Sequence, residues 1–249
     1  MCLGGFDLQA WLEQFKAEFD LNFIQGNRWT FLVEGLKNTL TITFFALLIG
    51  VALGVVIAMV RSTYDKTAGN ARPSLGRKLF GLANGVCKVY LTVMRGTPVV
   101  VQLMIFFFVI MASSRNGVLV ASLAFGLNSG AYVAEIIRGG IMSIDNGQFE
   151  AGRSLGFNYL QTMQHIVIPQ TIKNVLPSLM NEFIALLKET SVAGYVAVMD
   201  LTKGGDIIRG RTFSAFMPLI AVALIYLALV MFLTWVAGIV ERRLRSSDH

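Results

Sequence analysis

Charged side chains inside apolar segments are the residues of this sequence best suited to chemistry. Glu182 lies in the apolar stretch 175–198, and Lys188 interrupts it. An ionisable group at the centre of a membrane helix costs on the order of 3 kcal/mol. Its presence therefore indicates either contact with a transported molecule or a structural ion pair. Helical spacing places Glu182 and Glu189 on one face, and Asn181 and Lys188 on the adjacent face. This pattern predicts a polar wall along a transport pathway, with a structural ion pair as the alternative.

A second polar feature, the sequence RGTP, begins at Arg95 in an otherwise apolar run. Gly96 and Pro98 are expected to break or kink a helix. Backbone groups freed by such a break in a membrane must meet protein or a water-filled cavity. Thr97 and Gln102 are therefore expected to line the same pathway. Arg95 is interpreted as an anchor at the cytoplasmic interface, or alternatively as a ligand contact.

The segment 147–169, GQFEAGRSLGFNYLQTMQHIVIP, is polar in a chain that is 55% hydrophobic. Asp145 or Asn146 can cap a helix start, and Gly156 is a natural helix stop. The sequence therefore predicts a short helix from Gln148 to Gly156.

This short helix is expected to carry Glu150 and Arg153 on one face, and a second helix should run from about Tyr159 to Pro169. A lone short helix is marginal in water, so a partner surface is expected to receive it. An amphipathic loop at the membrane interface is the alternative interpretation.

The composition indicates the surroundings of these residues. Only 14% of the residues are charged, against roughly 25% in a soluble domain, and the mean hydropathy is +0.63. Charge-free runs reach the ~20 residues needed to cross a bilayer. We expect an all-α integral membrane protein with five transmembrane helices, at 38–60, 96–114, 116–134 and 212–240, with a weaker one at 175–198. The expected parts are a lead (1–34), a membrane domain (35–245) and a tail (246–249), with a loop at 64–78.

Local details of these spans are also expected from the sequence. The second span should begin well before Gly96 and form a long bent helix. Small residues in the third span should let helices approach closely, although plain bundle packing explains them equally well. Cys87 is interpreted as a small buried hydrophobe, and His165 as a neutral structural residue without metal-ligand company.

The distribution of charge predicts the orientation. Basic residues gather between residues 61 and 95, which is typical of a cytoplasmic loop. Acidic residues predominate in the lead, which is the reverse of a signal peptide. The N-terminus should therefore lie outside and the C-terminus inside, although the bases at 203–211 would then lie outside. The net charge of +6 is explained by anionic lipid headgroups, without nucleic acid.

Several motifs resemble the permease subunits of ATP-binding-cassette importers, in the polar amino-acid branch that takes up histidine, glutamine or arginine. Glu150-Ala151-Gly152 is followed three residues later by Gly156, and then by a hydrophobic run ending at Pro169. Gly152 replaces the usual Ala, and the residue before Pro169 is Ile in place of Leu. The resemblance extends over most of 35–245, through NTLTIT (38–43), MRGTPVVVQL (94–103), the stretch 130–156 and NEFIALLKETSV (181–192).

This resemblance implies a passive pathway subunit in a bacterial cell membrane. Two such permeases, identical or paralogous, would form the channel, two ATPase subunits would bind ATP and Mg²⁺, and an external amino-acid-binding protein would deliver substrate. The chain has no phosphate-binding glycine loop, so no cofactor and no enzyme activity are expected in it. The residues expected to couple to the ATPase are Gln148, Glu150, Ala151, Gly152, Arg153 and Gly156.

The resemblance also gives the polar wall a substrate. Glu182 would attract the α-ammonium group or a cationic side chain, and Asn181 or Lys188 would lie nearer the carboxylate. Two other classes of protein remain as alternatives. An ATP-independent carrier or channel would require inverted repeats or a selectivity ring. An intramembrane enzyme would rest on Asp200 and Asp206, or on the pair Tyr64 and Asp65, as acids.

Overall fold

The computed structural model describes residues 8–67 and 75–246, and every regular element in those two ranges is helical, which confirms the all-α prediction. The long helices are α2 (Trp29–Thr67), α3 (Leu75–Gly96), α5 (Gly117–Met142), α8 (Ile168–Glu189) and α10 (Phe216–Ser246). The shorter ones are α1 (Leu8–Phe19), α4 (Val99–Ile105), α6 (Asn146–Ser154), α7 (Tyr159–Thr162) and α9 (Leu201–Thr212). Irregular turns of helix join them at Asp20–Ile24, Gln25–Asn27, Phe106–Ile110, Met163–Val167 and Thr190–Val196. Part of the expected loop at 64–78 and most of the expected tail lie outside the described residues.

Three helices of the described chain are long and apolar enough to cross a membrane, namely α2, α5 and α10. A fourth crossing is reached if α3 and the segment Val99–Ile110, which are bent by 110° at their junction, count as one. The break expected at Gly96 and Pro98 is therefore confirmed in position. The run 96–114 is not itself a spanning helix, because the straight length lies before the break, in α3.

The weaker span expected at 175–198 was placed too far along the chain at both ends. Helix α8 starts at Ile168 and ends at Glu189, so Lys188 lies at the end of the helix rather than within a span. Pro169 occupies the first turn of α8, where a missing backbone N–H is tolerated. A π turn at Met163–Val167 carries the helix into α8 without a loop.

The core is centred on α2 and α5, which pack along their lengths. A Cβ at Gly54 would lie 2.5 Å from Cγ1 of Val133, and a Cβ at Gly126 would lie 2.8 Å from Cβ of Ile49. A Cβ at Gly50 would lie 3.3 Å from the backbone N of Gly130. The close approach predicted from the small residues of the third span is therefore confirmed.

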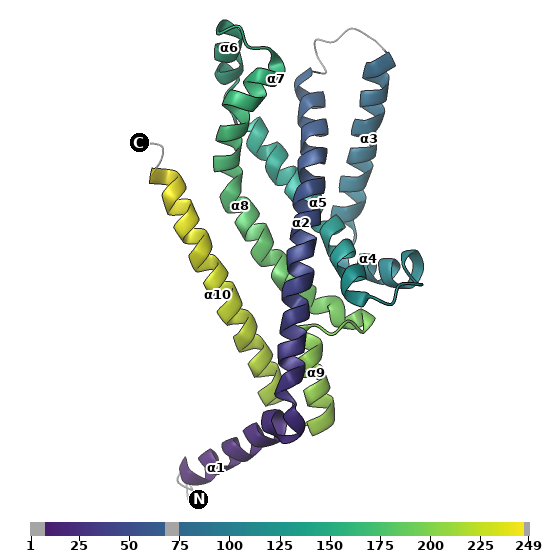
Figure 1. The fold of residues 1–249 in the computed structure, drawn as a ribbon, viewed down its shortest axis with the longest axis vertical. Helices are drawn as coiled ribbons and strands as arrows, with labels where there is room; N and C mark the ends of the chain where they lie inside the picture. The colour runs from purple at the N-terminus through teal and green to yellow at the C-terminus, as the bar shows by residue number, and fades with distance from the viewer. Residues whose placement is uncertain (1–7, 68–74, 247–249) are drawn as a thin grey trace, which may run out of the picture.

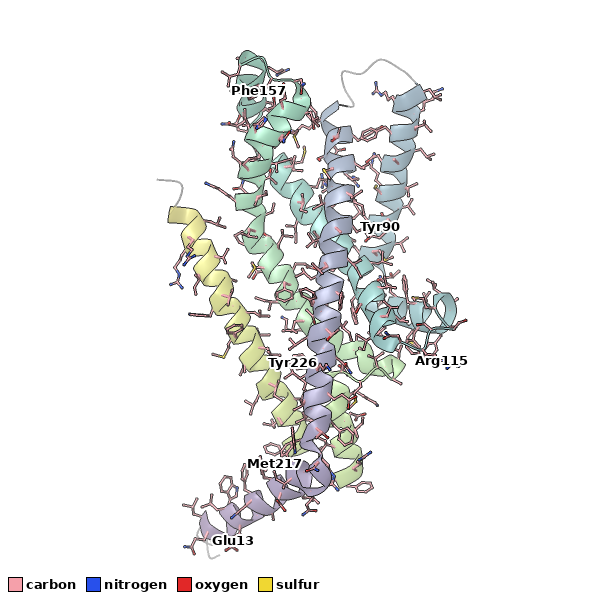
Figure 2. The ribbon with its side chains drawn as sticks, viewed as in Figure 1. Glu13, Tyr90, Arg115, Phe157, Met217 and Tyr226 are labelled. Carbon is pink, nitrogen blue, oxygen red and sulfur yellow. The ribbon has the colours of Figure 1, made fainter. Side chains whose placement is uncertain are left out.

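The helices of the pair run in the same direction, since successive positions of α2 meet successive positions of α5. Near their last turns Arg138 of α5 lies 3.6 Å from Asp65 of α2. Figure 1 shows α6 and α7 at this end of the molecule, and α1 and α9 at the opposite end. Figure 2 marks the two ends by Phe157 and Glu13.

Candidate coupling helix and transport pathway

The short helix predicted from Gln148 to Gly156 is present as α6, which begins and ends two residues earlier, at Asn146 and Ser154. The side chain of Asp145 caps it by accepting a hydrogen bond from the backbone N–H of Gly147 at 2.5 Å. Gly156 ends it with a positive φ of 81°, a conformation that glycine adopts without steric cost. The second helix begins at Tyr159, behind a capping box formed by Asn158 and Gln161.

One side of α6 is fixed to the rest of the protein by aromatic and cationic contacts. Phe149 stacks on Tyr159 with ring centroids 6.4 Å apart. Lys66, in the last turns of α2, donates a hydrogen bond to Oδ1 of Asn146 at 2.9 Å. The same ammonium group lies 4.6 Å from the centre of the Phe149 ring. Helix α6 is thus attached to both α2 and α7.

Gly152 is the buried residue of α6. A Cβ at this position would lie 2.6 Å from Oγ1 of Thr162, whose side chain is itself buried. The glycine that replaces the usual alanine therefore has a packing reason, because it lets α6 and α7 approach closely. The sequence alone shows only its cost to helix propensity.

The other side of α6 is open. Gln148, Glu150, Ala151, Arg153 and Gly156 are all exposed. A cavity of about 430 Å³ adjoins Glu150 and Arg153 and extends to Lys66 and Tyr159.

Two exposed leucines accompany this polar surface. Leu155 is 71% exposed and Leu160 is 73% exposed. The sequence analysis did not select them, although two leucines on either side of Gly156 in a polar segment are a signal for a contact surface.

Glu182 is half-buried in α8 and accepts a hydrogen bond at 2.8 Å from the Ser129 hydroxyl of α5. Asn181 and Lys188 are exposed on the same helix. The rise of an α-helix separates Glu182 from Lys188 by about 9 Å along the axis. Ser129 was not predicted as a partner, since the sequence placed it among small packing residues.

Gln102 and Thr97 lie together at the break between α3 and α4. The Gln102 amide donates to the carbonyl oxygens of Met94 and Thr97 at 2.9 and 3.1 Å, and to Oγ1 of Thr97 at 2.7 Å. Its own oxygen accepts a hydrogen bond at 2.9 Å from Asn128 of α5. Gln102 is 6% exposed, so these contacts meet the backbone groups that the break frees. Thr97 remains exposed.

Arg95 belongs to a network of charges between α2, α3 and α5. Its guanidinium lies 3.7 Å from the carboxylate of Glu135 and 5.8 Å from the centre of the Tyr132 ring. Glu135 also pairs with Arg138 at 3.0 Å. A cavity of about 500 Å³ adjoins Arg95 and is lined in addition by Arg61, Lys88 and Glu135. The ion pair with Glu135 holds the Arg95 side chain in place, which is compatible with either an interface anchor or a ligand contact.

Asp200 caps α9 at the opposite end of the molecule. Its Oδ1 accepts a hydrogen bond from the backbone N–H of Lys203 at 2.8 Å, while Oδ2 is buried without a hydrogen-bond partner among the described residues. Burial raises the pKa of this carboxyl to about 6. Hydrogen bonds from Arg209 and Lys203 instead lower the pKa of the half-buried Asp206. Asp200 packs against α2, whereas Asp206 is ion-paired with Lys203 and Arg209, so the two acids do not share one site.

An apolar helical bundle with a polar contact between two of its long helices, and with a separate capped helix exposed at one end, fits a membrane transport permease. Comparison with known proteins agrees. The sequence profile described as "Binding-protein-dependent transport system inner membrane component" matches residues 74–246. The chain belongs to this family, and the resemblance noted from its motifs is confirmed.

Individual relatives cover nearly the whole chain. The arginine transport system permease protein ArtQ of Bacillus subtilis is 36% identical over 222 residues, which is 88% of this chain and 94% of that protein. The putative glutamine transport system permease protein GlnP of Rickettsia bellii is 35% identical over 217 residues, covering 86% and 93% respectively.

Solved structures share the fold. A chain from the crystal structure of an amino acid ABC transporter with histidines is 37% identical, with a TM-score of 0.75, covering 89% of this chain and 98% of that one. A chain of the MetNI methionine ABC transporter in an inward-facing conformation is 18% identical, with a TM-score of 0.71, covering 87% and 97%.

Proposed function

We propose that this chain is the membrane pathway subunit of an ATP-driven importer for polar amino acids, and that α6 couples it to separate ATPase subunits. The observation that carries the proposal is the construction of α6. Its inner side is anchored on Lys66 and Tyr159, while Glu150 and Arg153 remain exposed beside a cavity. The similarity to an arginine permease and to a putative glutamine permease supports the substrate class.

The proposed assembly contains two permease chains, two ATPase subunits that bind ATP and Mg²⁺, and an external amino-acid-binding protein. In the proposed topology α2, α3, α5, α8 and α10 are the five spans, with the N-terminus outside and the C-terminus inside. The 22 residues of α8 reach about 33 Å, enough for a hydrocarbon core of about 30 Å. The placement of α6 and α1 at opposite ends supports this orientation (Figure 1).

Coupling would follow the contacts of α6. A movement of the ATPase against α6 passes to α2 through Lys66, because that lysine contacts both Asn146 and Phe149. It passes to α8 through α7 and the π turn at Met163–Val167, which form one continuous helical path. Since α8 carries Glu182, the same displacement reaches the pathway, and packed helices amplify small shifts between discrete arrangements.

The proposed substrate contact is Glu182. Its carboxylate attracts the α-ammonium group or a cationic side chain of the amino acid, and Asn181 or Lys188 lies nearer the substrate carboxylate. The hydrogen bond from Ser129 holds the Glu182 carboxylate in position between α5 and α8.

The coupling role is tested with the variant Glu150→Arg in proteoliposomes that contain the ATPase and the binding protein. We expect loss of ATP-dependent uptake with normal insertion, because the charge on the exposed face is reversed without disturbing the buried side. Glu13→Arg, an exposed acid on α1, is the matched control and should transport normally. Normal uptake by Glu150→Arg, or uptake by the permease without ATPase, would refute the proposal.

The substrate role is tested with Glu182→Gln. Losing a charge-assisted contact of about 1.5–3 kcal/mol weakens substrate binding by roughly 10- to 150-fold. The amino-acid concentration needed for half-maximal stimulation of the ATPase should rise accordingly. Glu34→Gln, at an exposed acid near the start of α2, is the control. An unchanged response of Glu182→Gln would assign this carboxylate to the structural pairing with Ser129 alone.

A further inference from the structure

Helix α1 lies before the region matched by the family profile, which begins at residue 74. None of its residues is buried. Figure 1 shows it running across the end of the bundle, at a large angle to α2 and α10. Transport through the bundle does not explain why a helix should lie in this direction.

The direction of α1 is fixed by the turn that follows it. Asn22 is fully buried there, where its amide donates to the Glu18 carbonyl at 2.8 Å and its oxygen accepts from the Thr212 hydroxyl at 2.8 Å. Phe23 joins the core cluster formed with α2 and α9. Gly26 then turns the chain into α2 with a positive φ of 64°. The helix therefore extends from a packed joint.

The apolar residues of α1 form one stripe. At 100° per residue the spacing places them on a single face, opposite Glu13. Their side chains are between 43% and 58% exposed, which is far from what burial in a protein core would give. The stripe consists of Leu8, Trp11, Leu12, Phe15 and Phe19. The rings of Trp11 and Phe15 stack with centroids 5.5 Å apart.

This stripe faces the side of the molecule occupied by α10. Trp11 and Phe15 share a cavity of about 630 Å³ with Phe216 and Met217, the first residues of α10. Beyond this corner α10 is the most exposed of the apolar spans, with 17% of its apolar window buried. Bilayer lipid covers such a surface wherever no second chain packs on it, and the apolar stripe of α1 continues this surface of α10.

We propose that α1 is an interfacial anchor that lies in the outer leaflet, with its apolar stripe at the boundary between headgroups and acyl chains and Glu13 toward water. The start of α10 sets the depth of α1 in the bilayer, because Trp11 and Phe15 lie beside the first residues of that span. Aromatic side chains favour this boundary. The charge near the stripe is negative, because it includes three acids and one lysine, namely Glu13, Glu18, Asp20 and Lys16. Attachment of α1 therefore rests on burial of apolar side chains and requires no anionic lipid.

The proposal rests on the outward orientation of the N-terminus proposed above, and its test uses the assembled transporter in nanodiscs of zwitterionic lipid. Replacing Trp29 and Trp235 by Phe leaves Trp11 as the single tryptophan of this chain, and the same assembly with Trp11→Phe gives the background from the partner chains. We expect blue-shifted emission, and stronger quenching by lipids brominated near the headgroup than by lipids brominated near the chain end. Trp11 emission typical of an indole in water, without quenching by either lipid, would overturn the proposal. Loss of quenching when the binding protein is added would also overturn it.

Two variants sharpen the result. Phe15→Glu in the stripe should reduce quenching of Trp11 by at least half, whereas Ala17→Glu on the opposite face should leave it unchanged. Equal effects of the two would overturn the proposal. A cysteine at Glu13, in a chain with Cys2 and Cys87 replaced, should react with an impermeant maleimide from outside intact cells. Labelling only from inside would overturn the orientation.

These outcomes separate the anchor from the transport function. Quenched Trp11 without ATP-dependent uptake would refute the proposed function alone. ATP-dependent uptake with Trp11 in water would refute the anchor alone.

Discussion

Replacing Asp200 by Asn should change how the stability of the protein depends on pH. Asp200 is fully buried and its pKa is raised from 3.8 to about 6 by that burial. The native state therefore holds a proton that the unfolded state releases at lower pH. The carboxyl contributes no penalty below the unfolded pKa, and it costs stability progressively as the pH rises from about 4 to about 6.

The size of this penalty follows from the shift of about two pKa units at about 1.4 kcal/mol each. It amounts to about 3 kcal/mol at pH 8 and to about half of that at pH 5. Asn keeps the oxygen that caps α9 but cannot ionise. Relative to Asp200→Asn, the wild type should therefore lose about 1.4 kcal/mol between pH 5 and pH 8, or roughly 3–6 °C in melting temperature.

The assay is thermal unfolding of the purified complex in detergent across this pH range. Asp206→Asn is the control, since Arg209 and Lys203 lower the pKa of Asp206 and its titration ends below pH 5. Its melting temperatures should parallel those of the wild type. If the melting temperatures of Asp200→Asn and the wild type change in parallel with pH, burial does not raise the pKa of the Asp200 carboxyl, and the reasoning is refuted.

Two further predictions concern close packing and backbone pairing. Gly152→Val should separate α6 from α7 and reduce ATP-dependent uptake at least about tenfold. Adding Thr162→Ala should recover part of the uptake, because it removes the side-chain atoms that the valine would meet. Identical uptake by the single and double variants would contradict this prediction. Gln102→Leu leaves the Thr97 carbonyl oxygen without its Gln102 donor and the Asn128 amide without its Gln102 acceptor, at about 1–3 kcal/mol for each polar group left unpaired in a buried site. The melting temperature should therefore fall, whereas Gln164→Leu on the surface should leave it unchanged.

Features set by a few adjacent residues were predictable from the sequence. The cap at Asp145 and the stop at Gly156 depend on local backbone chemistry, and both were found where expected. The position of the break before α4 was likewise predictable, because Pro98 restricts the residue before it and removes a donor.

Features set by contacts between distant segments were not predictable. The 110° angle at the break depends on where Gln102 finds carbonyl oxygens, and the pairing of Glu182 with Ser129 depends on the register between α5 and α8. The start of α8 was missed because the sequence analysis ended the second helix at Pro169, whereas the π turn at Met163–Val167 carries that helix on into α8. In each case the local sequence is compatible with more than one arrangement, and packing selects among them.

Backbone contact between α2 and α5 limits where the protein can bend. Glycines bring the two helices so close that one cannot rotate or slide against the other without steric overlap, as the position of Gly54 against Val133 shows. The pair should move as a single stiff body during a transport cycle. Flexure is then left to α10, the least buried of the apolar spans, so engineered changes that lock the cycle should concentrate where α10 meets α8 and α9.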